Sequence, residues 1–326
     1  VMKNRIAILD IWQGYRDRHS APDCVAAFRD AIGTDCLSYG AAYYPWLNTT
    51  VVAEAELNCT QLDTDSQDLL IEGIKAEFAS MNLPSAKLTE MSNIAEQIKS
   101  VNAESPEVVA SLAKTLSTIS PFYKSIMAEM RKRLNLLPPS AAMAGIFTMV
   151  DNTRGVWKAP ANVSLNGVVS ACVPISHEQQ EDLNVTPQGK SINAIRDFVG
   201  EGVLVWGART LDGNSLDYRY INVRRTLIML EESIRLAAKA IVFEPNTADT
   251  WVTIKSMIVN FLTSIWKRGG LAGATPEDAF SVSVGLGETM TQQDILDGIL
   301  RVTALVTISR PAEFIEITFE QKMQTS

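Results

Sequence analysis

The chain has 326 residues, of which 46% are hydrophobic, 20% charged and 7% aromatic, and 29 basic against 37 acidic residues give a net charge of −8. This composition excludes a disordered or fibrous protein, and the acidic balance argues against a nucleic-acid-binding protein, which usually presents a basic face. The chain has only two histidines, and its four cysteines are well separated, which excludes most metal sites built from imidazoles or from Cys-x-x-Cys pairs. A membrane-spanning helix needs about 18 consecutive apolar residues, and no apolar run in this sequence is that long.

The first fifty residues alternate between strand-like and helical patterns. Residues 6–10 form a short apolar run typical of a buried strand, Pro22 and Asp23 open a short helix, and residues 38–44 predict a second strand that stops at Pro45. This β-α-β order favours parallel strands covered by helices. Because the chain enters a strand within its first six residues, we expect further sequence to precede it.

Residues 51–135 have a different amino-acid pattern, which is typical of polar helices with narrow apolar stripes. The spacing of leucine, isoleucine and methionine predicts a pair of helices over residues 106–118 and 121–134. Ser105 and Ser120 stand at the N-cap positions of this pair, and each is followed by a proline at the first helical position.

Most of the excess negative charge falls in one segment of the chain. Residues 53–120 contain eleven acidic and four basic residues, a net of −7, which leaves about −1 for the rest. We therefore expect this acidic segment to face solvent, and the nearly neutral remainder to tolerate dense packing against other protein surfaces.

The last part of the chain carries the most regular helical patterns. Residues 222–239 predict an amphipathic helix with a favourable i,i+4 pair between Glu231 and Arg235. Residues 248–268 predict a second amphipathic helix, which ends at the glycine pair Gly269 and Gly270.

Strand-like runs surround and follow these two helices. Residues 240–243 predict a strand closed by a proline, and residues 280–284 and 300–308 predict two more. The run at 314–319 alternates apolar and acidic or hydroxyl side chains, which is typical of an amphipathic strand.

The sequence contains almost no catalytic or ligand-binding motif. Cys172, His177 and Glu178 are the only local thiol, imidazole and carboxylate set, in a region with no ordered scaffold signal. Residues 63–68 begin like a calcium-binding loop but lack its turn glycine and final glutamate, and residues 202–207 lack the lysine of a phosphate-binding loop. The sequence therefore nominates no catalytic residue, cofactor or metal.

Several motifs in the second half of the chain have a specific order and spacing. They are LPPSAAMAG at 137–145, VWGART at 205–210, RYINVRR at 219–225, VFEPN at 242–246, GATP at 273–276 and RPAEFI at 310–315, with YYPW at 43–46 upstream. In this order they resemble the C-terminal part of contractile tail sheath proteins of phages, phage-tail-like bacteriocins and extracellular contractile injection systems.

The resemblance implies a fold and a division of the chain. It implies an α/β sheath core, with a mixed sheet flanked by helices, formed by residues 1–50 and 136–311. It also implies that residues 51–135 are an inserted, peripheral, mainly helical domain and that residues 312–326 are a C-terminal arm. The family's N-terminal arm would precede residue 1.

The resemblance also implies a function. Sheath subunits stack as hexameric rings around an inner tube, and collapse of the metastable sheath drives the tube through a target envelope with energy stored at assembly. Baseplate and tail-terminator or cap proteins are the further partners, without nucleic acid or membrane insertion. Assembly is expected in the cytoplasm, as part of a phage-tail-like particle that is released from the cell.

Two sets of residues are candidates for contacts between subunits. The terminal strand is expected to exchange into a neighbour's sheet through its apolar side chains, the alternative being an ordinary edge strand within one subunit; these side chains are Phe314, Ile315, Ile317 and Phe319. Basic side chains are candidates for contacts with the tube or an adjacent subunit, the alternative being helix solubility and helix-dipole pairing; these are Arg224, Arg225, Lys267 and Arg268.

Two other identities stay open from the sequence. One is a cytosolic α/β enzyme that uses Cys172 or a pair of carboxylates. The other is a sheath homologue of the type VI secretion class, although that class usually divides its sheath between two chains.

Overall fold

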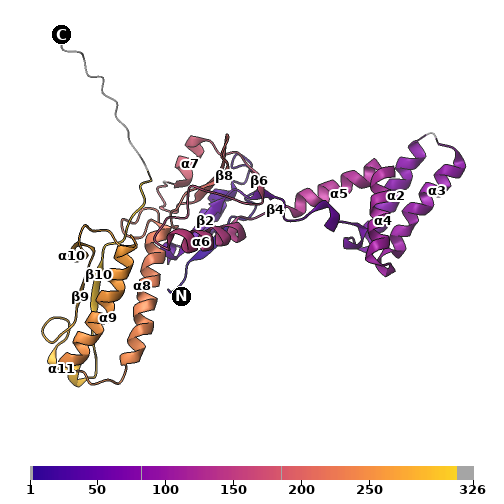
Figure 1. Cartoon of the computed structure of the whole chain (residues 1–326). Coiled ribbons are helices and arrows are strands. Elements are labelled where there is room, and N and C mark those ends of the chain that lie inside the picture. Colours follow the sequence, from indigo (N-terminus) through magenta and orange to yellow (C-terminus); the bar gives the residue numbers. More distant parts are fainter. Residues whose placement is uncertain (1–2, 82, 185, 314–326) are drawn as a thin grey trace, which may run out of the picture. The chain divides into compact units, whose positions relative to one another are not determined.

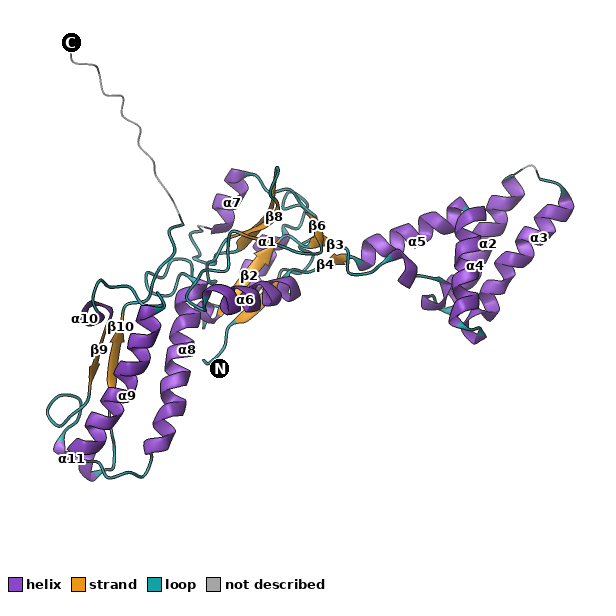
Figure 2. Cartoon of the chain, viewed as in Figure 1, coloured by secondary structure: helices purple, strands orange, loops and turns teal. Residues whose placement is uncertain are grey.

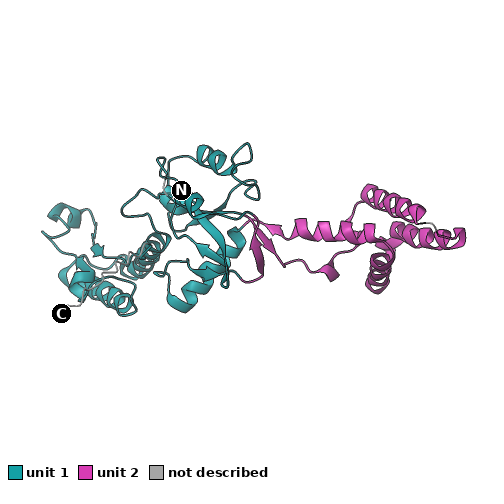
Figure 3. Cartoon of the chain, turned by 90° about the horizontal axis from the view of Figure 1, so that it is seen from above, with its two compact units in different colours: residues 1–45, 139–165, 173–326 teal, residues 46–138, 166–172 magenta. Residues whose placement is uncertain are grey.

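The computed structural model describes residues 3–81, 83–184 and 186–313. The chain divides into two compact units, which Figure 3 distinguishes by colour. Unit 1 comprises residues 1–45, 139–165 and 173–326, and unit 2 comprises residues 46–138 and 166–172.

A five-stranded mixed sheet forms the centre of unit 1 (Figure 1). Its strands, in spatial order, are β1 (Ala7–Asp10), β2 (Gly40–Tyr44), β7 (Asn193–Phe198), β8 (Gly202–Trp206) and β5 (Val163–Ser164). The first three strands run parallel, and the β7–β8 and β8–β5 pairs are antiparallel. The predicted mixed α/β fold and the parallel β-α-β start are therefore confirmed.

Helices connect and cover this sheet (Figure 2). Helix α1 (Cys24–Ala31) links β1 to β2, and the Asp23 side chain caps it by accepting from the Val25 backbone N–H at 2.8 Å. Helix α6 (Ser140–Arg154) contacts β1, and the Asp10 carboxylate accepts from the backbone N–H and the hydroxyl of Ser140 at 2.8 and 2.6 Å. Helix α7 (His177–Asn184) lies against β7.

A second group of elements in unit 1 has its own core, and we call it the α8–β10 lobe. It comprises α8 (Ile221–Ala238), α9 (Ala248–Lys267), α10 (Pro276–Ala279), α11 (Gln292–Leu296) and the antiparallel pair β9 (Phe280–Ser283) and β10 (Thr303–Val306). The side chains buried between them include Leu230, Ile254, Ile258, Leu262 and Val282. Both long helices and the strands predicted at 280–284 and within 300–308 are confirmed.

Two predictions for this lobe are wrong. Arg235 pairs with Glu232, three residues before it, at 2.5 Å, and not with Glu231. Residues 240–243 form no strand, because a short 3-10 turn, η5 (Lys239–Ile241), continues α8. Phe243 follows with a φ of +75°, which is outside the extended region that a strand requires, and its side chain is fully exposed. The run predicted as a strand at 314–319 lies outside the described residues.

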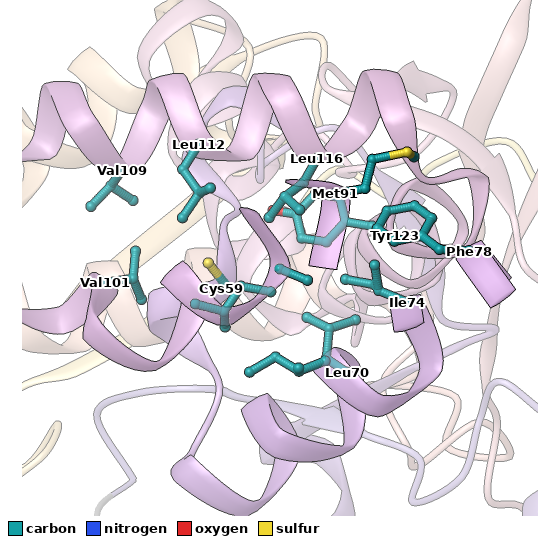
Figure 4. Close-up of a cluster of buried hydrophobic side chains, with 13 residues drawn as sticks. Cys59, Leu70, Ile74, Phe78, Met91, Val101, Val109, Leu112, Leu116 and Tyr123 are labelled. Carbon is teal, nitrogen blue, oxygen red and sulfur yellow. The ribbon is translucent and has the colours of Figure 1, made fainter. Parts of the chain in front are cut away.

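Unit 2 is built mainly from four helices with a separate apolar core (Figure 4). The helices are α2 (Thr64–Ser80), α3 (Ser85–Glu96), α4 (Pro106–Ile119) and α5 (Pro121–Leu134), with 3-10 turns η2 (Glu54–Glu56), η3 (Cys59–Gln61) and η4 (Gln97–Ala103). The side chains that meet in the core include Ile74, Phe78, Met91, Leu116 and Tyr123.

The predicted caps of α4 and α5 have different outcomes. Ser120 caps α5, since its hydroxyl accepts from the Tyr123 backbone N–H at 3.1 Å while it donates to the Glu77 carboxylate. The other oxygen of Glu77 accepts from the Phe122 backbone N–H at 2.9 Å. Ser105 makes no side-chain cap hydrogen bond. The Glu77 carboxylate therefore ties α2 to the start of α5.

A small antiparallel sheet closes the base of unit 2. Its strands are β4 (Leu136–Leu137), β3 (Leu47–Thr49) and β6 (Val168–Ala171), in that spatial order. Asn135 joins the two ends of the helical segment, because its side-chain amide donates to the Val52 carbonyl at 2.9 Å and accepts from the Val52 N–H at 2.8 Å. The chain therefore leaves and re-enters this sheet at neighbouring points.

The net charge is divided differently when it is counted over the two structural units and not over residues 53–120 and the remainder. Helix α5 carries Arg131, Lys132 and Arg133 in its last turn, and these offset part of the acid in residues 53–120. Unit 2 then holds 12 acidic and 8 basic residues, and unit 1 holds 25 and 21, so each has a net charge of −4. The nearly neutral remainder inferred from the sequence is thus a result of ending the count before α5.

Candidate interaction surface

The four basic candidates from the sequence occupy different environments. The Arg224 side chain is 5% exposed, and its guanidinium donates to the Ser38 hydroxyl at 2.8 Å and stacks on Tyr39 and Tyr218. These contacts inside unit 1 fix where α8 begins relative to the chain before β2. We therefore assign Arg224 to positioning within the subunit.

Arg225 is also engaged inside unit 1. Its guanidinium forms a two-point ion pair with the Asp151 carboxylate at 2.8 and 2.5 Å and lies over the Phe147 ring at 4.7 Å. Because Asp151 and Phe147 are on α6, this pair ties α8 to α6. Two-point arginine–carboxylate pairs are directional as well as strong.

Lys267 and Arg268 are exposed at the end of α9, as a surface contact requires. The Arg268 guanidinium lies 5.0 Å from the centre of the Trp157 ring. Such cation–π contacts are worth about 0.5–1 kcal/mol at exposed sites. Arg268 is thus held in a defined position at the surface.

A cavity of about 350 Å³ beside Arg268 gathers further basic side chains that the sequence did not nominate. Its lining includes Arg154, Lys158 and Arg310 together with Arg268 and Trp157, and we call this set the basic pocket. Arg154 ends α6 and Arg310 follows β10, so only the fold brings them together. The motif at 310–315 contains Arg310, but Arg154 lies about 150 residues before it, and this separation in sequence hides the cluster.

One carboxylate is paired with the basic pocket among the described ion pairs. Asp217 lies 3.8 Å from Arg310, and both side chains are more than half exposed. A group of cations with so little compensating acid favours an anionic partner. The basic pocket therefore has the chemistry to bind a surface rich in carboxylates.

The structure divides the thiol–imidazole candidate between the two units, because Cys172 belongs to unit 2 whereas His177 and Glu178 belong to unit 1. The His177 ring lies 3.3 Å from the Glu181 carboxylate on the same helix, and both side chains are exposed. None of the four cysteines is in a disulfide, and burial raises the pKa of the Cys24 and Cys59 thiols, which disfavours the reactive thiolate. Within residues 3–81, 83–184 and 186–313 there is no metal-binding group of His, Cys, Asp and Glu, and no helix with the length and apolar character to cross a bilayer.

The calcium-loop motif has a structural role. Asp63 precedes α2, and its side chain accepts from the Ser66 backbone N–H at 2.8 Å. Residues 63–68, which match the start of a calcium-binding loop, therefore form the first turn of α2, with Asp63 as its N-cap.

Comparisons with known proteins find similarity over part of the chain. Residues 214–322 match the family model described as the phage tail sheath C-terminal domain. The tail sheath protein of Vibrio phage KVP40 is 28% identical over 163 residues, 49% of this chain and 24% of that protein. The tail sheath protein of Burkholderia phage BcepMu is 30% identical over 115 residues, 34% of this chain and 24% of that protein.

Solved structures extend the match to more of the chain. A chain of the extracellular contractile injection system PVC sheath complex in its contracted state is 44% identical, with a TM-score of 0.55, over 57% of this chain and 51% of that one. A chain of the anti-feeding prophage helical sheath in its contracted state is 46% identical, with a TM-score of 0.53 and the same coverage.

This chain spans about a quarter of the curated relatives and about half of the solved chains. The family-model match at 214–322 contains four of the motifs named from the sequence, those at 219–225, 242–246, 273–276 and 310–315. Over the part of the chain that these comparisons cover, the protein is similar to contractile tail sheath proteins.

Proposed function

We propose that this chain is a structural subunit of a contractile sheath, which stacks in hexameric rings around an inner tube and contracts to drive that tube through a target envelope. The observation that carries the proposal is the sheath-domain match over residues 214–322, which includes the whole α8–β10 lobe from α8 onward. The contracted sheath structures that resemble this chain at 44–46% identity support the same assignment.

The proposal needs no chemical step catalysed by the subunit. The energy of contraction is stored when the extended sheath assembles, so the subunit acts by changing its contacts with neighbours. A lattice of identical subunits repeats each weak contact many times, which makes individually small polar interactions sufficient. We therefore infer a non-enzymatic role.

We infer that the basic pocket, with Lys267 beside Arg268, is a contact to an acidic partner surface, on the inner tube or an adjacent sheath subunit. Exposed ion pairs are worth about 0–1 kcal/mol each and weaken with salt. Contacts of this kind release without unfolding either protein. That property suits a sheath that must let go of its tube when it contracts.

We infer that the segment after residue 313 exchanges into the sheet of a neighbouring subunit. From Ile315 to Phe319 its apolar side chains alternate with Glu316 and Thr318, and this pattern matches an added strand. The apolar residues proposed to enter the neighbouring sheet are Phe314, Ile315, Ile317 and Phe319. The β9–β10 pair is a two-stranded sheet in the described part of the chain, so its edges offer main-chain groups for such addition. Baseplate and cap proteins would complete the particle, which assembles in the cytoplasm and acts outside the cell.

Negative-stain microscopy tests the proposal. The protein is expressed with the genes that flank its own, and the particles are collected from the lysate. We expect long hollow tubes with a regular axial repeat. A protein that remains a soluble monomer at high concentration would overturn the proposal.

A further inference from the structure

The last described residue is held by a compact polar contact. The Glu313 carboxylate accepts hydrogen bonds from two nitrogens of the Arg209 guanidinium: Nε lies 2.9 and 3.1 Å from the two carboxylate oxygens, and Nη2 lies 2.7 Å from one of them. The Tyr220 hydroxyl donates to the same carboxylate at 3.0 Å. Arg209 is 4% exposed, so the pair is shielded from water and from salt. We call these three residues the arm-root clamp.

Arg209 is fixed in turn by the central sheet. Its backbone N–H donates to Asn193 Oδ1 at 2.7 Å, and Asn193 Nδ2 donates to the carbonyl of Ala42, in β2, at 3.1 Å. Arg209 Nη1 also donates to the Asn184 carbonyl at 3.2 Å. Gly207 permits this close approach, because a Cβ there would lie 2.7 Å from Asn193 Oδ1. The guanidinium therefore has one position relative to β2 and β7.

The chain just before Glu313 is tied to different elements. The Thr307 carbonyl accepts from the Ala272 N–H at 2.7 Å, and the Ser309 carbonyl accepts from Asn222 Nδ2 at 3.0 Å. Both ties hold the chain to the α8–β10 lobe. Arg310 makes only an exposed contact to the loop after β8, with Asp217 at 3.8 Å, whereas Glu313 makes a short, buried contact to that loop through Arg209.

We propose that the arm-root clamp fixes where and in which direction the C-terminal arm leaves the subunit, so that a pull on the arm is carried into the five-stranded sheet. This inference rests on the proposed strand exchange. Arg209 and Tyr220 are then positioning residues for a strand that they do not themselves form. A buried two-point pair suits the task, because it defines one orientation and removal of either partner leaves the other unpaired.

The test compares Glu313→Gln with a matched variant elsewhere in unit 1. Asp151→Asn removes the carboxylate of the similar two-point pair with Arg225, so it controls for the loss of a partly buried ion pair. We expect both variants to keep the far-ultraviolet circular dichroism of the wild type. We expect Glu313→Gln alone to raise the protein concentration needed for tube formation at least tenfold.

Hydrogen exchange of the peptide that contains residues 307–313 gives a readout in the unassembled protein. The clamp predicts at least tenfold faster exchange in Glu313→Gln and wild-type exchange in Asp151→Asn. Tyr220→Phe removes a single O–H donor, so it should fold in any case and give a smaller shift, about threefold, in the same direction.

The outcomes separate the clamp from the function. Tubes at the wild-type concentration together with unchanged exchange in Glu313→Gln would overturn the clamp and leave the sheath function standing. An equal loss of assembly in Asp151→Asn would also overturn it, because general destabilisation would then explain both variants. A wild-type protein that never forms tubes would overturn the proposed function, and with it the proposed role of the clamp in assembly.

Discussion

Excision of the helical segment is the perturbation that most sharply separates the two units. We would remove residues 55–133 and join Glu54 to Leu134 with three glycines. The side-chain amide of Asn135 hydrogen-bonds to both the backbone carbonyl and the backbone N–H of Val52, so the new loop has to close only a short gap. The apolar core of the helical segment is its own, and so is that of the α8–β10 lobe.

The cost of the excision follows from loop closure. Six residues would connect Val52 to Asn135, and the closure term (3/2)RT ln n gives about 1.6 kcal/mol for a flexible loop of that length. A change of that size moves the melting temperature by about 3–6 °C in a domain of 150–250 residues. We therefore expect a single cooperative transition close to that of unit 1 in the full chain.

Calorimetry and microscopy measure the result. The shortened protein should melt cooperatively and form tubes at a concentration close to that of the full chain if residues 55–133 are peripheral. A protein without a cooperative transition would refute the reasoning, because it would show that the helical segment is needed for the remaining residues to fold.

Three further predictions concern stability. Leu116→Ala, which empties a fully buried site in unit 2, should destabilise that unit by about 2–5 kcal/mol in urea unfolding, whereas Val108→Ala on the exposed face of the same helix should change stability by less than about 0.5 kcal/mol. The backbone N–H and the hydroxyl of Thr291, the N-cap of α11, lower the pKa of Asp294 from 3.8 to about 2, and Arg301 contributes to the shift. The resulting stabilisation is complete above about pH 4 and is lost as the pH falls through 2. The stability difference between wild type and Asp294→Asn should therefore shrink over that window, and a constant difference would contradict the assignment. Deletion of residues 312–326 should lower the melting temperature more than deletion of 314–326, since only the longer deletion removes Glu313, and equal melting temperatures would argue against the clamp.

Local signals explain what the sequence could predict of this fold. Helix α5 has the predicted bounds of 121–134, because Ser120 caps it, Pro121 starts it and Asn135 ends it. The same logic failed at residues 240–243, where an apolar run with strand character continues a helix as a 3-10 turn. A strand depends on a partner elsewhere in the chain, and no local pattern reports whether that partner is present.

The interaction surface was harder to predict for the same reason. Arg154, Arg268 and Arg310 belong to one pocket but are separated by up to about 150 residues in the sequence. Arg224 and Arg225 are neighbours in sequence and were nominated together as surface residues, yet both guanidiniums are engaged inside unit 1. Charge and helical position alone do not distinguish a buried positioning arginine from an exposed contact.

The most direct test of the central proposal is the length and width of assembled particles before and after a trigger of contraction, such as mild denaturant, measured by electron microscopy. The account predicts tubes whose outer wall becomes shorter and wider while an inner tube of unchanged diameter is exposed. Tubes that keep their length and width until they dissociate into subunits would contradict it.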